Sequence, residues 1–307
     1  MIPVVDLAII GAGPGGLSAA IYAVRAGLSV AMYEKALAGG QITNTDLVEN
    51  YLGFPEVVEG SFLVEQMVEH ARRFGVEAQP GEVTSIEPCD EGFVLHGISG
   101  EPTARTVCIV TGSTPRKLGV PGEERFRGAG VSYCAVCDGF FFRGKRVCVV
   151  GGGDAACEES LYLAKICEKV TLIHRRNELR AVDALKRPCM EHDRIEIIWD
   201  TVVEEVLGER GVTALKLRNR RTDEVSEIPT DGLFIYVGSL PNSWFVRGLL
   251  ELDDQGFIIV DKLMATSVRG IAAAGDVRSE SYRQIAAAVG DGCVAALTAS
   301  RWILGGI

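Results

Sequence analysis

Short, nearly continuous apolar stretches alternate along the chain with helical patterns of apolar and polar residues. Near the start, VVDLAII (4–10) is typical of a strand buried on both faces of a sheet. A helical pattern, LSAAIYAVRAG (17–27), separates it from a second apolar stretch, LSVAMYEK (28–35). A strand, a helix and a strand in this order predict an α/β fold built on a parallel sheet.

The same order of elements returns in the middle of the chain. An apolar strand at 147–150 precedes the helical pattern CEESLYLAKI (157–166), and VTLIHRR (170–176) follows as the next strand. We therefore expect an α/β protein with two Rossmann-like, three-layer nucleotide-binding domains.

A loop of small residues joins the first strand of each module to its helix. In this pattern the first residue permits a tight turn, the second lets backbone N–H groups approach a pyrophosphate, and the third lets the helix pack close to the strand. The three positions are filled by Gly11, Gly13 and Gly16 in the first loop and by Gly151, Gly153 and Ala156 in the second. The two loops predict two dinucleotide sites in one chain.

The second strands of the two modules end in opposite charges. The first ends at Glu34, whose carboxylate can hold the ribose hydroxyls of an adenine dinucleotide. The second ends at His174, and three arginines follow it: Arg175, Arg176 and Arg180. Because arginines grip a 2′-phosphate with fork-shaped hydrogen bonds, NADPH is favoured over NADH, with His174 as a further phosphate ligand. The alternative is a basic face that only contacts solvent.

Composition narrows the class of protein. A chain of 307 residues with 47% apolar and 23% charged residues suits two soluble domains, and a net charge of −10 argues against nucleic acid or an anionic membrane as the main partner. The N-terminus has no basic region of a signal peptide, and no apolar stretch approaches the length of a membrane span. Nine cysteines without a secretion signal indicate a reducing compartment, so we expect a cytoplasmic location.

Two segments rich in helix and strand breakers divide the chain. They are TGSTPRKLGVPGEERFRG (111–128) and VGSLPNS (237–243). The tail beyond them, IAAAGDV and an alanine-rich helix expected from Tyr282 to Leu304, is too short for a separate domain. We expect it to complete the first domain, which then comprises residues 1–115 and 246–307, with 116–245 inserted as the second. Two linkers form a natural hinge.

The stretch SYCAVCDGFF (132–141) places Cys134 and Cys137 three positions apart, directly before Asp138. A structural zinc site needs four ligands, and the chain has neither a second CxxC nor a CxxH at matching spacing. Its remaining candidates, His70, His96 and His192, show no metal-ligand spacing. Two readings of Cys134 and Cys137 remain: a pair of incidental core cysteines or a reducible disulfide. Cys108 and Cys148, which lie in apolar strands, are expected to be core cysteines.

An ordered set of motifs carries a family resemblance over essentially the whole chain. The motifs are GAGPGG, GGQIT (39–43), TGSTPR, CAVCDGFF, GGGDAA, HRRNELRA and GDVRSESYRQIAAAVGDG. With them the chain resembles the low-molecular-weight, bacterial-type thioredoxin reductases. The resemblance implies FAD in the first domain, NADPH in the inserted one, a homodimer, and thioredoxin or a thioredoxin-like protein as partner.

The resemblance also implies which residues bind each cofactor. For FAD these are Gly11, Gly13, Pro14, Gly15, Gly16, Glu34, Lys35, Gly39, Gly40, Gln41, Ile42, Asn50, Val83, Thr111, Gly112, Gly275, Asp276, Arg283, Gln284 and Ile285. For NADPH they are Gly151, Gly152, Gly153, Asp154, Ala155, Ala156, Glu158, His174, Arg175, Arg176, Arg180 and Gly238. A helix expected to begin near Arg283 would turn its positive end toward a reduced flavin.

The resemblance further implies a route for electrons. A hydride passes from NADPH to FAD, and two electrons then reach the Cys134–Cys137 disulfide and the partner protein. Cys137 would face the flavin, Cys134 would attack the partner, and Asp138 would carry the proton. One flavin face cannot receive nicotinamide and disulfide together, so the inserted domain is expected to rotate on its linkers.

The partner is less well specified than the cofactors. Phe140 and Phe141 are candidate contacts for it, with core packing as the alternative. The family commonly has threonine where this chain has Val136 and arginine where it has Ala129, for which nearby Arg127 is a candidate substitute. A flavoprotein of the same build that reduces another small redox protein or oxidises a small dithiol stays open, and so does a redox sensor that binds NADPH and FAD.

Overall fold

The structure, a computed structural model, describes residues 4–44 and 47–305. The chain forms two compact units: unit 1 comprises Met1–Thr114 and Leu240–Ile307, and unit 2 comprises Pro115–Ser239. The second boundary lies between residues 239 and 240, earlier than the 245/246 boundary expected from sequence. The reason is packing, because Phe245 is buried in the core of unit 1 and Asn242 forms two hydrogen bonds with Thr111 of the same unit.

A seven-stranded sheet forms the centre of unit 1, and its middle strands are parallel. The strand β1 (Val5–Ile10) lies between β2 (Val30–Glu34) and β8 (Thr103–Ile109). The other strands are β5 (Ala78–Pro80), β6 (Ser85–Cys89), β7 (Gly92–His96) and β19 (Ile271–Ala273). Leu7 and Ile9 of β1 face one apolar cluster while Ala8 and Ile10 face another, so β1 is buried on both sides as its sequence predicts.

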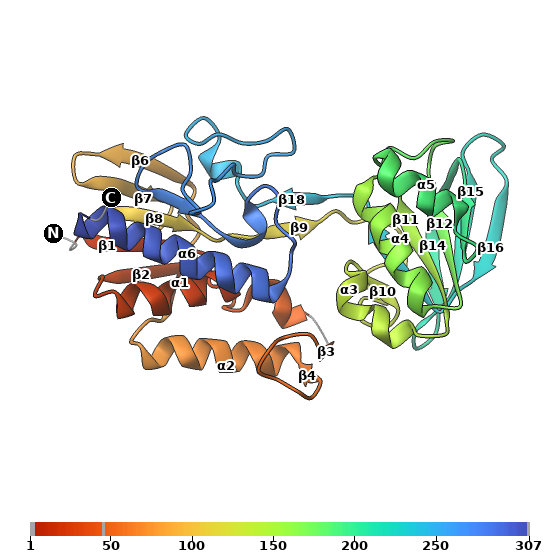
Figure 1. Ribbon diagram of the computed structural model, residues 1–307, viewed down its shortest axis with the longest axis horizontal. Helices are drawn as coiled ribbons and strands as arrows, with labels where there is room; N and C mark the ends of the chain where they lie inside the picture. Colours follow the sequence, from red (N-terminus) through yellow and green to blue (C-terminus); the bar gives the residue numbers. More distant parts are fainter. Residues whose placement is uncertain (1–3, 45–46, 306–307) are drawn as a thin grey trace. The chain divides into compact units, whose positions relative to one another are not determined.

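Helices α1 (Pro14–Arg25) and α6 (Ile285–Leu304) lie side by side on one face of this sheet (Figure 1). Small residues allow the close approach, since a Cβ on Gly292 of α6 would lie 2.0 Å from the carbonyl oxygen of Gly15. The helix α6 begins at Ile285 and not at Tyr282 as expected, because Arg283 has a φ of 54°, outside the helical region. Among the described residues no helix is both long and apolar enough to cross a membrane.

Shorter elements complete unit 1. They are the helix α2 (Gly60–Arg73), the strands β3 (Leu47–Val48) and β4 (Val58–Glu59), and the 3₁₀ turns Gly40–Asn44, Trp244–Val246 and Gly275–Val277. The helix α2 packs against α1 and against the turn Gly40–Asn44. The turns at 40–44 and 275–277 contain residues expected to bind FAD, so α2 and α6 support candidate site segments.

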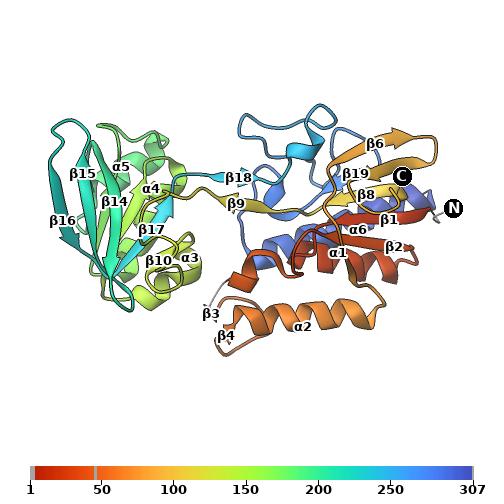
Figure 2. The same ribbon diagram turned by 180° about the vertical axis from the view of Figure 1, so that it is seen from behind.

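Unit 2 has three layers around a five-stranded parallel sheet (Figure 2). The strand order is β10 (Val131–Ser132), β17 (Gly232–Tyr236), β11 (Arg146–Gly151), β12 (Lys169–Ile173) and β13 (Ile195–Ile198). The helices α4 (Asp154–Ile166) and α5 (Asp183–Glu191) form one layer, and the antiparallel strands β14 (Thr201–Gly208), β15 (Val212–Asn219) and β16 (Val225–Pro229) form the other. Val147 and Val149 of β11 face the helices, and Cys148 and Val150 face the antiparallel sheet.

The chain passes between the units twice, and the two passages pair with each other. The strands β9 (Ser113–Pro115) and β18 (Ser239–Pro241) form a two-stranded ribbon. Sequence predicts breaker-rich linkers at both places but not this pairing. Prolines at the ends of both strands are compatible with it, because each strand of a two-stranded ribbon has a free edge.

Candidate active site

The glycine loop of unit 1 is packed so closely that side chains are excluded from it. Gly11 has a φ of 108°, and a Cβ there would lie 2.4 Å from the carbonyl oxygen of Val110. A Cβ on Gly16 would lie 2.0 Å from the carbonyl oxygen of Gly11. Gly13 by contrast faces open space, with nothing within 4 Å of its Cβ position. The loop thus leaves its middle accessible to a phosphate group, which fits a dinucleotide site.

Glu34 lies at the end of β2 and reaches back to this loop. Its carboxylate accepts hydrogen bonds from the N–H groups of Ala12 at 2.8 Å and Ala36 at 3.0 Å. A pocket beside it is lined by five of the predicted FAD ligands: Gly11, Glu34, Lys35, Val83 and Thr111. The convergence of these residues from four parts of the sequence supports an adenosine site in unit 1.

The segment that would lie along the flavin is tied to the same loop. Gly39 donates a backbone hydrogen bond to the carbonyl of Ala12 at 2.8 Å, and a Cβ on Gly39 would lie 2.3 Å from the Val64 side chain. The Gln41 amide donates to the carbonyl of Ser113. Ile42 is buried in a small apolar cluster that includes Ile285. The structure therefore brings GGQI and the start of α6 together within unit 1.

The carboxyl group of Asp276 is expected to bind the ribityl chain of FAD. Burial raises the pKa of its carboxyl, while the Ser281 hydroxyl donates to it at 3.3 Å. A buried carboxyl with one weak donor is ready to bind the hydroxyls of a sugar alcohol. Nearby, Asn50 donates its side-chain amide to the Gln284 side chain at 3.4 Å, and the Arg283 guanidinium lies 5.4 Å from the ring centre of Phe257.

The glycine loop of unit 2 is equally close-packed but uses different neighbours. A Cβ on Gly151 would lie 2.5 Å from the carbonyl oxygen of Tyr236 and 2.6 Å from the Ala156 methyl group. A Cβ on Gly152 would lie 2.1 Å from the His174 ring. Gly153 faces open space, as Gly13 does in unit 1. This loop therefore also fits a dinucleotide phosphate.

His174 is placed differently from the other predicted NADPH ligands. Its side chain is only 4% exposed, and its ring nitrogens lie 2.6 Å from the carbonyl oxygen of Gly151 and 3.0 Å from that of Glu178. Burial is the main cause that lowers the pKa of His174. Both nitrogens are engaged by backbone, so the ring supports the loop and is not directed at a phosphate.

The arginines after His174 are exposed and open to a ligand. Arg175, Arg176 and Arg180 form no ion pair with any residue in the described part of the chain. The backbone N–H of Arg180 donates to the carbonyl of Gly152 at 2.6 Å, so the basic segment is fixed beside the glycine loop. An exposed, unpaired set of guanidinium groups next to a phosphate-binding loop fits the 2′-phosphate of NADPH.

The remaining predicted NADPH residues flank this loop. The Asp154 carboxylate accepts the backbone N–H of Val182 at 2.8 Å, which connects the start of α4 to the start of α5. Ala155 and Glu158 are exposed on α4. Gly238 has a φ of 108° and accepts a hydrogen bond from the backbone N–H of Arg116 at 2.9 Å.

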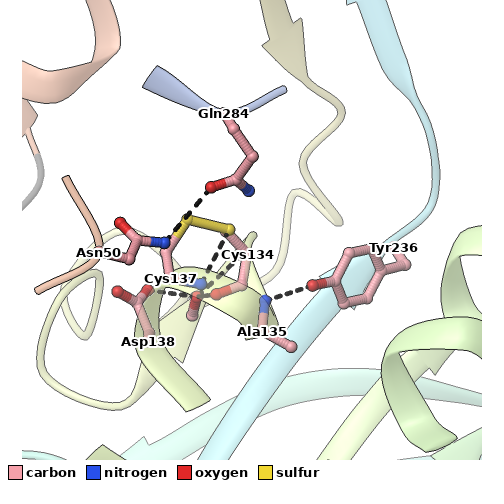
Figure 3. Close-up of a disulfide and its surroundings, with 8 residues drawn as sticks. Asn50, Cys134, Ala135, Cys137, Asp138, Tyr236 and Gln284 are labelled. Carbon is pink, nitrogen blue, oxygen red and sulfur yellow. Dashed lines mark hydrogen bonds between the residues drawn. A yellow bond between two sulfur atoms is a disulfide. The ribbon is translucent and has the colours of Figure 1, made fainter. Parts of the chain in front are cut away.

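Cys134 and Cys137 form a disulfide, with Cα atoms 5.3 Å apart (Figure 3). They flank the start of the short helix α3 (Ala135–Asp138), where Cys137 N–H donates to the Cys134 sulfur at 3.2 Å. The Ser132 hydroxyl accepts from Cys134 N–H at 3.0 Å and donates to the Asp138 carboxylate at 2.5 Å. Asp138, the predicted proton carrier, is thus connected to the disulfide through one hydroxyl group.

Cys108 and Cys148 differ from the disulfide pair in their burial and reactivity. Burial raises the pKa of the Cys108 and Cys148 thiols to about 12, so these core residues are poor nucleophiles. Within residues 4–44 and 47–305 there is no cluster of three or more metal-ligating side chains. Of the three readings of the CxxC, the disulfide is the one formed.

Residues after the disulfide present an aromatic surface. Phe140 is 46% exposed, and the Arg143 guanidinium lies 5.2 Å from its ring centre. Phe141 lies with its ring 6.1 Å from that of Phe140 but also packs against the apolar core of unit 2. Val136 is exposed as well. The exposure of Phe140 suits a contact with another protein, whereas Phe141 is shared between core and surface.

Comparison with known proteins identifies the family. The model of the pyridine nucleotide-disulphide oxidoreductases matches residues 5–292. A thioredoxin reductase of Bacillus subtilis is 44% identical over 299 residues, which cover 97% of this chain and 94% of the relative. The crystal structure of thioredoxin reductase from Streptococcus pyogenes aligns with a TM-score of 0.93 at 42% identity and covers 99% of this chain and 100% of that chain. The chain belongs to the pyridine nucleotide-disulphide oxidoreductases.

Within this family it groups with the low-molecular-weight thioredoxin reductases. One from Treponema pallidum is 44% identical over 97% of both chains. The predicted α/β class with two Rossmann-like domains is confirmed, and so are FAD and NADPH as cofactors. The assignment of single residues to these cofactors stays a prediction that the geometry above supports.

The sequence did not predict two residues of unit 1 that hold candidate FAD-binding segments in place. Asn242 accepts at its carbonyl from the Thr111 hydroxyl at 2.7 Å and donates its side-chain amide to the carbonyl of Thr111 at 2.8 Å. Asp291 pairs with Arg278 at 2.6 Å and accepts the N–H of Gly275 at 3.1 Å, which fixes the turn before Asp276. Asn242 could have been found as a polar residue next to Pro241, but Asp291 has no local signal.

A further candidate lies near the basic segment. The Arg220 guanidinium donates to the carbonyl of Arg175 at 3.3 Å. The sequence signal was present as RNRRTD (218–223), a second basic run, which on its own suggests only a solvated turn. The structure brings the two basic runs together inside unit 2.

Proposed function

We propose that the protein is an NADPH-dependent thioredoxin-disulfide reductase whose substrate is a thioredoxin or thioredoxin-like protein with an oxidised cysteine pair. The Cys134–Cys137 disulfide at the start of α3, with Asp138 joined to it through Ser132, is the observation that carries this proposal. The relatives named above support it, because they are thioredoxin reductases.

The two units would divide the cofactors between them. Gly11, Gly13, Glu34 and Asp276 of unit 1 would hold FAD, and Gly151, Gly153 and the exposed arginines of unit 2 would hold NADPH. When bound, FAD supplies the chemistry that converts a hydride from NADPH into an electron pair for the disulfide. His174 would support this site without touching NADPH, because its ring keeps the loop at Gly151 and Gly152 in position.

The reduced cysteines would then act on the partner. The Cys134 thiolate attacks one sulfur of the partner's disulfide, so a mixed disulfide forms and the partner's other sulfur leaves as a thiolate. Asp138 provides the proton for that leaving sulfur. Cys137 next attacks the Cys134 sulfur, which restores the Cys134–Cys137 disulfide and releases the partner as a dithiol. By the family pattern, Cys137 is the sulfur that receives the electrons.

The β9–β18 ribbon would serve as the hinge between half-reactions. Both linkers enter and leave unit 2 through this ribbon, so a change in a few backbone angles there can turn the unit as a whole. We further propose a homodimer, a cytoplasmic location, and contacts to the partner from Phe140, Phe141 and Arg127. Arg127 is exposed, and its guanidinium lies 5.7 Å from the Tyr133 ring centre.

The test is NADPH-driven reduction of a thioredoxin by the FAD-loaded protein. We expect reduction by the unaltered chain, loss of about 10³-fold or more in Cys134→Ser, and no comparable loss in the control Cys89→Ser, which removes an exposed free cysteine. Reduction of a general disulfide dye without reduction of any thioredoxin would refute the partner. Failure to reduce even the dye would refute the enzyme and favour a sensor.

A further inference from the structure

Glu159 on α4 has a buried carboxylate oxygen that no part of the proposed reaction uses. Its Oε2 atom lies away from solvent and has no hydrogen-bond partner among the residues that the structure describes. A buried, unsatisfied carboxylate oxygen is costly when the group is charged. Burial accordingly raises the pKa of Glu159 to about 7, and the charge of Glu158 acts in the same direction. Near neutral pH this side chain changes its charge.

Tyr236 belongs to β17, which packs against α4, the helix that carries Glu159, and α4 also packs against the disulfide helix α3. Tyr236 ends β17, opposite Gly151 in the register of β11. Its hydroxyl accepts a hydrogen bond from Ala135 N–H at 2.5 Å, and Ala135 is the first residue of α3, between the two cysteines (Figure 3). The phenol therefore holds the backbone of the cysteine helix. Since this bond uses an oxygen lone pair, the hydroxyl proton stays available for a carboxylate.

Two carboxylates act on Tyr236. Burial raises the pKa of this phenol well above its ordinary range, and the charges of Glu159 and Asp138 add to the effect. A negative charge near the phenol disfavours its ionised form, so its hydroxyl keeps its proton. Asp138 accepts a hydrogen bond from the Ser132 hydroxyl. Glu159 has a buried oxygen with no such donor in the described part of the chain.

We propose that Glu159 is a positioning residue that acts through Tyr236 on the reduced Cys134–Cys137 pair: by holding or releasing its proton it sets the charge felt by the cysteine helix. This rests on the proposed function, which supplies the two electrons that break the S–S bond. With two protons the products are two thiols, and loss of one proton gives the Cys134 thiolate. A neutral Glu159 adds no charge near that thiolate, and an ionised Glu159 adds one negative charge.

The proposal has a distinctive pH signature. Below pH 7 the Glu159 side chain is mostly neutral, so replacing it with glutamine changes little. As the pH rises through the titration of Glu159, the unaltered protein gains a negative charge that opposes the thiolate, whereas Glu159→Gln does not. We expect Cys134 in this variant to be alkylated at the normal rate near pH 6 and about threefold faster near pH 8, which corresponds to a thiol pKa lower by about half a unit.

The measurement is the rate of Cys134 alkylation by iodoacetamide between pH 5.5 and 9, after reduction with dithiothreitol. Peptide mass spectrometry separates Cys134 from exposed Cys89. Glu168→Gln is the matched control, because it removes the same charge from an exposed position just beyond α4. Tyr236→Phe should shift the profile in the same direction as Glu159→Gln but at every pH, since Ala135 N–H loses its acceptor.

The outcomes distinguish this inference from the proposed function. If the ratio between Glu159→Gln and the unaltered protein stays constant from pH 5.5 to 9, Glu159 has only a structural effect and the inference is wrong. If Glu168→Gln gives the same pH-dependent ratio, a general change in surface charge explains it and the inference is again wrong. Neither result depends on NADPH, so failure of the reductase proposal would appear separately, as absent disulfide reduction in the unaltered protein.

Discussion

The two glycine loops follow one sequence pattern but are stabilised by different neighbours. In unit 1 the third position must be glycine, because a Cβ on Gly16 would lie 2.0 Å from the carbonyl oxygen of Gly11. In unit 2 the same position is Ala156, whose methyl group is buried and occupies the space beside Gly151. The pattern therefore requires a small residue at this position, and the distance between helix and loop decides which one.

The ends of the second strands show a similar exchange. Glu34 and His174 each lie 23 residues after the first glycine of their loops. Each side chain turns back onto its loop: Glu34 accepts the Ala12 N–H, and the His174 ring contacts the Gly151 carbonyl. The residue at this position thus supports the loop in both units. In unit 1 its side chain accepts a hydrogen bond from a loop N–H, whereas in unit 2 its side chain contacts a loop carbonyl. Selection of a phosphate in unit 2 is left to the exposed residues that follow, Arg175 and Arg176.

Substitution of the third small residue of each loop should change stability and cofactor binding most, and differently in the two units. Gly16→Ala would place a methyl group against the loop backbone, which cannot move away easily, so we expect about 1–3 kcal/mol of destabilisation and release of FAD. The reverse change, Ala156→Gly, should cost only about 1 kcal/mol, from helix propensity and lost packing. Urea unfolding and the flavin content of purified protein measure both. Equal effects of the two variants would contradict the difference in packing.

Removal of the exposed arginines should have the next largest effect. Arg175→Ala with Arg176→Ala should reduce the preference for NADPH over NADH by about one to two decades, because loss of one charge-assisted bidentate contact to the 2′-phosphate costs about 1.5–3 kcal/mol. The ratio of kcat/KM values for the two nucleotides is the measurement.

The control for the arginine prediction is Arg187→Ala, which removes an exposed arginine on α5. This control should leave the nucleotide ratio unchanged. An unchanged ratio in the double variant would show that the basic segment is only a solvated surface.

Sequence reasoning succeeded where one local pattern fixes the structure. The apolar run of β1, the small residues of both loops and the CxxC spacing each impose a backbone geometry or contact that few other residues allow. It failed where a role depends on contacts distant in sequence. His174 looked like a phosphate ligand because it precedes two arginines, yet its ring is buried by Gly152, 22 residues earlier. Glu159 and Tyr236 offered no signal, because their burial depends on the packing of α4 against β17.

The smallest predicted effect tests the buried state of His174. Burial lowers its pKa in the folded protein, so between that value and about 6.5 the unfolded chain binds more protons and stability falls as the pH decreases. The variant His174→Gln should lack this pH dependence. As the pH falls from about 7.5 to 5.5, its free energy of unfolding should rise relative to that of the unaltered chain by less than about 1 kcal/mol. Urea unfolding without nucleotide measures this, with His70→Gln in unit 1 as control. If instead His174→Gln becomes relatively less stable at low pH, the ring is protonated in the folded state and donates to both carbonyls, and the exchange of donor for acceptor between the two loops would include a full positive charge.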